Sequence, residues 1–229
     1  NKQAWEVDEV LAKLHAENKI QDIIVVGIWN GGATRHSDYF PQKAFEFLTK
    51  KQQDSIYSLE RSPGVKYFNG SVTSDNYLKF IVQELKPLID GKYAVHTSKE
   101  HTFVAGSSMG GLISMYAICE YPSVFGGAAC ISTHWPGIFQ VENNPIPTAF
   151  YRYLEKHLPN PKEHRIYFDF GTATLDALYE PLQKEVDAIM LQKGYNVNNW
   201  LTKKFEGENH SEIAWQKRLH FPFVFLFGI

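Results

Sequence analysis

One short segment carries the residue types of a nucleophilic enzyme. Gly106, Ser108 and Gly110 have the spacing G-x-S-x-G, which is the pattern of a nucleophile elbow with Ser108 at its tip. The serine of such a turn takes a strained backbone conformation, and the glycines remove clashes that larger residues would cause. An apolar strand is expected at residues 102–105 and an apolar helix at residues 112–118. This context predicts that Ser108 is a nucleophile, and the alternative is an ordinary structural turn.

The helix after Ser108 is expected to stabilise negative charge. The first N–H groups of a helix have no acceptor within the helix, and the helix dipole is positive at that end. Both would point at the oxyanion that forms when a serine hydroxyl attacks a carbonyl carbon. We therefore predict that the backbone N–H of Met109 is the first donor of an oxyanion hole.

A serine nucleophile needs a base, and the base needs an acid that orients it. In α/β-hydrolases these residues follow the serine in the order Asp or Glu, then His. Asp176 fits the acid best, because it lies in a turn directly after the strand expected at residues 165–170. The alternatives are Asp169, which lies inside that strand, and Glu180, which lies one turn into the next helix.

Two histidines follow these acid candidates. His210 lies in a polar loop between the last expected strand and the last expected helix. His220 lies late in that helix beside Phe221 and is expected to pack or to lie at the surface. We predict that His210 is the base; its alternative role is that of a loop residue bonded to the start of the helix.

Helices and apolar strands alternate along the chain, which is typical of a mostly parallel sheet with helices on both faces. Further strands are expected at residues 23–28, 127–131 and 200–205, and further helices at residues 5–15, 75–89, 148–157, 175–193 and 211–227. A proline-rich stretch at residues 133–164 is expected to be an insertion that forms a partial lid over the site. With no linker along the chain, residues 1–229 are expected to form a single domain.

Composition excludes several classes of function. The chain has 229 residues, 44% hydrophobic content and a net charge of −2, which suits one domain with a substantial core. Without a basic run or a long apolar run, neither nucleic acid nor a membrane is an expected partner. Motifs for metals, phosphates and dinucleotides are missing, so no metal or cofactor is expected. Cys119 and Cys130 are expected to be buried free thiols.

Beyond these patterns, the chain resembles the putative-esterase family of α/β-hydrolases, which includes enterochelin-esterase-like hydrolases, feruloyl and acetyl xylan esterases and S-formylglutathione hydrolases. Four segments carry the resemblance: residues 25–41, 105–112, 167–176 and 207–215. The pattern Arg-x-x-Asp-Tyr-x-Pro at residues 35–41 is more specific to this family than the elbow is. The resemblance implies an α/β-hydrolase fold, a metal-free triad of Ser108, Asp176 and His210, and hydrolysis of carboxylic esters.

This chain departs from the family pattern in one place. In the family, the second oxyanion donor resembles an x-Asp-Gly turn, and the order of the elements would place that turn before residue 1. The resemblance therefore predicts that this chain lacks N-terminal strands of the domain. The loop at residues 28–30 is an alternative source of the second donor.

The expected partner is a small-molecule or carbohydrate ester. Residues in loops after strand ends are candidates for lining its pocket, because binding sites gather there; these are Trp29, Arg35, Tyr39, His134 and Trp135.

Two other functions fit the same features. One is an acyltransferase that uses the same triad, and the other is a non-catalytic carbohydrate-binding protein on a hydrolase fold.

Overall fold

The centre of the protein is a parallel β-sheet. The computed structural model describes residues 4–68 and 70–229. The sheet has four strands that pair in the order β3 (Phe103–Ser107), β4 (Gly127–Ile131), β5 (Arg165–Gly171) and β6 (Trp200–Phe205). All neighbouring strands are parallel, with Ser107 opposite Ile131 and Ile131 opposite Asp169. The loops after these strands therefore meet at one end of the sheet.

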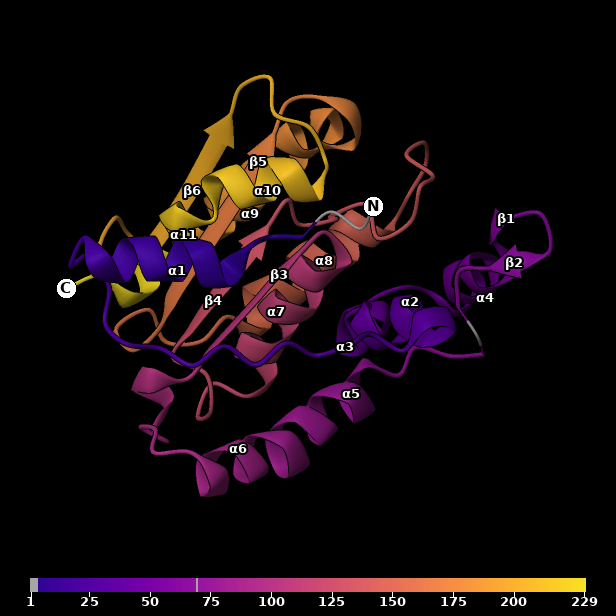
Figure 1. Ribbon diagram of the computed structural model, residues 1–229. Coiled ribbons are helices and arrows are strands. Elements are labelled where there is room, and N and C mark those ends of the chain that lie inside the picture. Colours follow the sequence, from indigo (N-terminus) through magenta and orange to yellow (C-terminus); the bar gives the residue numbers. More distant parts are fainter. Residues whose placement is uncertain (1–3, 69) are drawn as a thin grey trace.

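Helices cover both faces of this sheet (Figure 1). One face packs against α7 (Met109–Glu120), α8 (Ile146–His157) and α9 (Tyr179–Gln192). The other face packs against α1 (Val7–Ala16), α10 (Glu212–Arg218) and α11 (His220–Phe227). Side chains of a strand alternate between the two faces. Cys130 and Phe168 accordingly belong to the first layer, and Ile131 and Tyr167 belong to the second.

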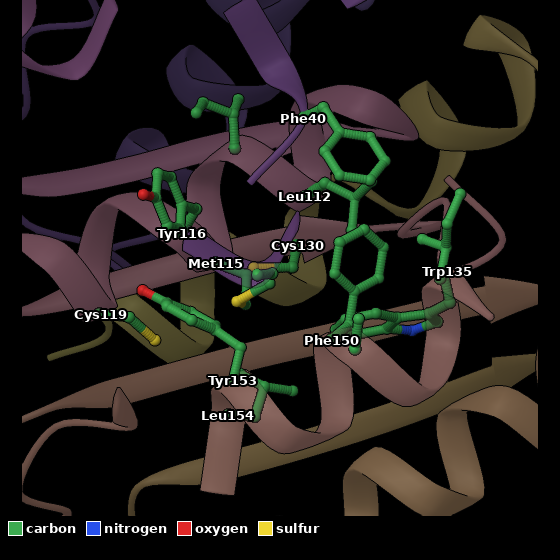
Figure 2. Close-up of a cluster of buried hydrophobic side chains, with 14 of the residues drawn as sticks. Phe40, Leu112, Met115, Tyr116, Cys119, Cys130, Trp135, Phe150, Tyr153 and Leu154 are labelled. Carbon is green, nitrogen blue, oxygen red and sulfur yellow. The ribbon is translucent and has the colours of Figure 1, made fainter. Parts of the chain in front are cut away.

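The larger core lies between the sheet and its first layer of helices (Figure 2). Phe40 and Phe150 meet there with their ring centres 5.2 Å apart. Helix α7 is buried along most of its length, because it is apolar on all sides rather than amphipathic. The two cysteines, Cys119 and Cys130, are buried and free, as expected.

Between α1 and β3 the chain forms a mainly helical region beside the sheet (Figure 1), and Phe40 and Phe45 of this region belong to the larger core. It consists of α2 (Arg35–Tyr39), α3 (Gln42–Phe45), α4 (Lys50–Ser58), a hairpin of β1 (Glu60–Ser62) and β2 (Val65–Lys66), then α5 (Ser74–Phe80) and α6 (Lys86–Lys92). A π-helical turn at Ile81–Leu85 joins α5 to α6. The helix expected at residues 75–89 is therefore confirmed and is longer than expected.

The strand expected at residues 23–28 is wrong. Ile24, Val25 and Val26 are 53%, 52% and 40% exposed, and the segment belongs to neither sheet. A β-strand exists only through hydrogen bonds to a neighbouring strand. Within residues 4–68 and 70–229, no strand pairs with this segment or with the outer edge of β3. Residues 23–28 have the apolar composition of a strand, but in the described chain they lack the backbone hydrogen bonds to a neighbouring strand.

The other expected elements are present; β4 and β6 have the expected ends, and the ends of the remaining elements are shifted. The closing helix expected at residues 211–227 is divided at Leu219 into α10 and α11. Within residues 133–164, α8 packs against α3 and α9 in the helical layer. The lid function of this stretch stays a prediction. In the described part of the chain, no helix is long and apolar enough to cross a membrane.

Candidate active site

Ser108 lies in a strained turn between β3 and α7. Its φ is 58° and its ψ is −120°, a conformation that non-glycine residues rarely adopt. The strand neighbour holds the turn in place, since the N–H of Ser108 donates to the carbonyl of Ile131 at 2.9 Å. The carbonyl of Ser108 accepts from the N–H of His134 at 3.2 Å. The loop after β4 therefore supports the turn that presents Ser108.

Gly106 makes this tight turn sterically feasible. A Cβ atom at Gly106 would lie 2.5 Å from the carbonyl oxygen of Gly110, which is a backbone clash that cannot be relieved by a side-chain rotation. A Cβ atom at Gly110 would meet nothing within 4 Å. The clash expected from the sequence is therefore confirmed at Gly106. At Gly110 the expectation is wrong, because a side chain at this position would have space. It is the backbone of Gly110 that a Cβ atom at position 106 would strike.

Asp176 and His210 lie in direct contact. The Nδ1 atom of His210 is 2.5 Å from Oδ1 of Asp176. The carboxylate is fully buried, and its second oxygen accepts from the N–H of Gly171 and the hydroxyl of Ser132, both at 2.6 Å. The imidazole is held edge-on to the ring of Trp215, with the ring centres 4.9 Å apart. With Nδ1 committed to Asp176, Nε2 is the ring nitrogen that stays available to another partner.

The loops that carry this pair are bound to each other by backbone contacts. The N–H groups of Thr172 and Ala173 both donate to the carbonyl of Glu208 at 3.0 Å. The N–H of His210 donates to the hydroxyl of Thr174 at 3.0 Å. The loop after β6 is thereby fixed on the loop after β5, and His210 is fixed relative to Asp176.

Hydrogen bonding keeps Asp176 ionised. Burial acts to raise the pKa of this carboxyl group, but hydrogen bonds from His210, Ser132 and the Gly171 N–H outweigh burial and hold the pKa below its usual value. An ionised carboxylate next to Nδ1 favours the tautomer of His210 with a proton on Nδ1.

Sheet topology puts Ser108 at the same end of the sheet as this pair. Ser108 follows β3, and Ser132, which bonds Asp176, follows the neighbouring strand β4. Adjacent strands lie about 4.8 Å apart. In the described chain the hydroxyl of Ser108 makes no hydrogen bond to the His210 ring, and such bonds often tighten only when substrate binds. The Met109 N–H lies at the first position of α7, where a helix leaves its donors unpaired.

The structure places the five expected pocket residues in different environments. His134 is buried 2.8 Å from the hydroxyl of Tyr179, whose ring stands edge-on to His210. Burial lowers the pKa of His134 to about 3, so its ring is neutral. The guanidinium of Arg35 lies over the ring of Tyr39 at 5.3 Å, and both residues are half-buried. Trp29 is 88% exposed.

The expectation that Trp135 lines the substrate pocket is wrong. Its side chain is completely buried, its ring packs against Phe168, and its Nε1–H donates to Gln183 at 2.8 Å (Figure 2). Residues 131–138 are all buried, so Trp135 is part of the core and does not line a surface.

We expect Trp135→Ala to lower the free energy of unfolding by about 3–5 kcal/mol, because it empties a filled core site and leaves the side-chain oxygen of Gln183 without its donor. Urea unfolding followed by circular dichroism measures this. Trp29→Ala is the matched control and should change stability by less than about 0.5 kcal/mol, since Trp29 is largely exposed. A Trp135→Ala protein of unchanged stability but altered KM would return Trp135 to the pocket.

The alternative acid and base candidates have other roles in the structure. Glu180 pairs with Lys184 at 3.0 Å and Lys204 at 2.9 Å. Asp169 pairs with Arg218 at 3.1 Å. The ring of His220 lies tilted against that of Phe221, with ring centres 4.1 Å apart. No group of three metal-ligating side chains occurs within residues 4–68 and 70–229.

Two buried residues next to Asp176 were not anticipated from the sequence. Ser132 bonds the carboxylate directly, and Arg218 bonds Ser132 at 2.6 Å. One feature of the sequence points to Ser132, namely its place directly after a buried strand. No such feature points to Arg218, because a cation near the end of a helix is an ordinary surface residue.

Comparison with known proteins identifies relatives of this chain. The model of a family described as putative esterase matches residues 1–225. The protein YbbA of Bacillus subtilis is 41% identical over 61 residues, which is 26% of this chain and 24% of that protein. The carboxylesterase SOBER1 of Arabidopsis thaliana is 27% identical over 93 residues, which is 41% of each chain. The chain thus spans less than half of each of these relatives.

Solved structures with the same fold have low sequence identity. A ferulic acid esterase superposes with a TM-score of 0.63 at 18% identity, over 97% of this chain and 77% of that one. An IroE-like serine hydrolase from Shewanella oneidensis has a TM-score of 0.63 at 14% identity, over 96% and 66%. The enterobactin esterase FES of Shigella flexneri has a TM-score of 0.55 at 19% identity, over 66% and 38%. The expected α/β-hydrolase fold, with a parallel sheet covered on both faces, is confirmed.

Proposed function

This chain belongs to the putative esterase family, and we propose that it hydrolyses carboxylic esters through an acyl-enzyme on Ser108. The observation that carries the proposal is the Asp176–His210 contact of 2.5 Å at the end of the sheet where Ser108 sits in its strained turn. A buried carboxylate, an imidazole and a serine at a helix N-terminus are the three groups that acyl transfer requires.

The reaction follows from the roles of these groups. Nε2 of His210 takes the hydroxyl proton as Ser108 Oγ forms a bond to the ester carbonyl carbon. The carbonyl oxygen becomes an oxyanion, which the Met109 N–H and the N-terminal end of α7 stabilise. The imidazolium then gives its proton to the departing alcohol. Water, deprotonated by the same nitrogen, releases the acid and regenerates Ser108.

The substrate we propose is a small-molecule or carbohydrate ester. Similar folds belong to proteins described as a ferulic acid esterase and an enterobactin esterase solved in the presence of a benzoyl-glycine compound, so the fold accommodates ligands with an aromatic group. The half-buried Arg35 over Tyr39 offers a cation beside an aromatic ring, which suits a substrate with an aromatic or anionic part.

Labelling with a fluorophosphonate probe tests the proposal. We expect one probe per chain on Ser108, mapped by mass spectrometry, and a labelling rate at least about 100-fold lower in His210→Ala, because the hydroxyl then lacks its base. His220→Ala is the control histidine variant and should be labelled at the normal rate, since the ring of His220 packs against Phe221 in α11. A folded wild-type protein that takes up no probe would refute the serine mechanism.

A further inference from the structure

Behind the Asp176–His210 pair lies a buried polar network of Ser132, Asp169, Arg218 and Trp215. Ser132 is its centre, and its φ of 40° is unusual for a residue other than glycine. The hydroxyl of Ser132 lies within hydrogen-bond distance of Asp176, Trp215 and Arg218, at 2.6, 3.0 and 2.6 Å. Its backbone N–H donates to the Asp169 carboxylate at 3.1 Å.

The chemistry of these partners determines where the hydroxyl proton of Ser132 points. Indole and guanidinium nitrogens only donate hydrogen bonds, and a carboxylate only accepts them. Trp215 and Arg218 therefore occupy the acceptor positions of Oγ, and the single hydroxyl proton must be donated to Asp176. The positive charge of Arg218 polarises this hydroxyl and strengthens the bond that it gives to Asp176.

The position of Arg218 is unusual for a structural ion pair. Its side chain is 2% exposed, yet Nε and Nη1 have no hydrogen-bond partner in the described chain. A guanidinium that serves stability alone usually binds a carboxylate with two nitrogens. Here Nη2 alone serves Ser132, Asp169 and, at 3.6 Å, Asp176. Arg218 therefore directs one nitrogen at the groups around Asp176, while two of its own nitrogens stay without a hydrogen bond in the described chain.

Arg218 also balances a second buried carboxylate. Burial raises the pKa of Asp169 to about 6, and Arg218, the Ser132 N–H and the Tyr167 hydroxyl oppose that rise. The pairing of Asp169 with Arg218 cancels one negative charge and leaves the charge of Asp176 directed at His210. Titratable and charged groups around the Asp176–His210 pair include Asp169, Arg218, Tyr179 and His134.

We propose that Arg218 is a positioning residue of the esterase site: acting through the Ser132 hydroxyl and Asp169, it fixes the Asp176 carboxylate in the orientation that His210 needs. This inference rests on the proposed function. It assigns to α10 a role in catalysis through Arg218, whose polar contacts in the described chain are with Ser132, Asp169 and Asp176.

The test compares Ser132→Ala, Arg218→Met and Arg218→Lys with the wild type, each normalised to the amount of protein that fluorophosphonate can label. We expect kcat to fall about 10-fold in Ser132→Ala and about 100-fold in Arg218→Met, with KM within about twofold, because a misaligned base slows the chemical step. Arg218→Lys should restore part of the loss, since its charge remains. Arg165→Met is the matched control: Arg165 bonds the Phe225 carbonyl at the other end of β5, and kcat should stay within about twofold.

The pH profile gives a readout that a purely structural role would not move. The negative charge of Asp176 is less dispersed without the Ser132 hydroxyl, so the imidazolium of His210 is more stable. The acidic limb of kcat/KM should therefore move to higher pH by about half a unit or more in Ser132→Ala. A lower melting temperature with unchanged kcat and an unchanged acidic limb in both Ser132→Ala and Arg218→Met would overturn the proposal.

A spectroscopic measurement separates this proposal from the proposed function. The Nδ1–H proton of His210 should give a low-field NMR resonance in the resting protein, and this resonance should shift in Ser132→Ala and in Arg218→Met but not in Arg165→Met. If the wild type shows neither labelling nor ester hydrolysis, the proposed function fails, while a shifted resonance still supports the positioning role. An identical resonance in wild type, Ser132→Ala and Arg218→Met would overturn that role, whatever the activity.

Discussion

Ser108→Ala is expected to lower kcat for ester hydrolysis by about 10⁴- to 10⁶-fold and to leave the fold intact. Removal of the nucleophile eliminates the acyl-enzyme route, and residual catalysis comes only from oxyanion stabilisation and substrate binding. The side chain of Ser108 makes no hydrogen bond within the described chain, and alanine can occupy the same backbone conformation as serine. Stopped assays with aryl esters measure the loss, and thermal unfolding checks the fold.

Ser107→Ala is the matched control, because Ser107 ends β3 immediately before the turn. It should retain kcat within about threefold. KM should change little in Ser108→Ala if substrate binds mainly through the surrounding loops. Hydrolysis by Ser108→Ala within about tenfold of the wild-type rate would exclude Ser108 as the nucleophile and would favour a non-catalytic or differently built site.

Asp176→Asn is expected to lower kcat by about 10⁴-fold. The second carboxylate oxygen of Asp176 accepts from the Gly171 N–H and the Ser132 hydroxyl, which are both donors. An asparagine must keep its carbonyl oxygen at that position, so its NH₂ group faces Nδ1 of His210. Nδ1 must then accept a hydrogen bond, the ring proton moves to Nε2, and that nitrogen can no longer take the proton of Ser108.

Asp187→Asn serves as the control for the loss of a carboxylate. Asp187 on α9 accepts from Gln183 and Thr202, both at 2.8 Å, and is expected to lie outside the reaction. Its variant should keep kcat within about twofold. Fluorophosphonate labelling of Asp176→Asn should be slowed in parallel with kcat. If Asp176→Asn retained more than a tenth of the wild-type kcat, the acid role of Asp176 would be refuted.

Much of the fold was predictable because its signals are local. Buried parallel strands are continuous apolar runs, and β4 to β6 were expected within a residue or two of their ends. The same holds for the turn at Ser108, since the need for glycine at position 106 arises from atoms four residues away. The choice of Asp176 over Asp169 as the acid candidate likewise rests on one local fact, its place just after the end of a strand.

Pairing and burial were less predictable. Residues 23–28 have the apolar, β-branched composition of a buried strand but no partner strand in the described chain, and a sequence run carries no record of its partner. Trp135 follows His134 directly in the chain, yet one faces Tyr179 near His210 and the other is enclosed in the core. The different surroundings of these two residues arise from the path of the chain after β4, which the residue composition of the segment does not reveal.

The sequence by itself determined the class of fold, the turn at Ser108 and the order of the acid and base candidates, because these depend on periodicity, backbone sterics and chain order over short distances. Only the tertiary structure decided which polar side chains stand behind Asp176. Ser132 and Arg218 are 86 positions apart and meet because the sheet and α10 pack against each other. Hydrogen bonds act over about 3 Å in space and are indifferent to separation along the chain, so a network of this kind becomes visible only after folding.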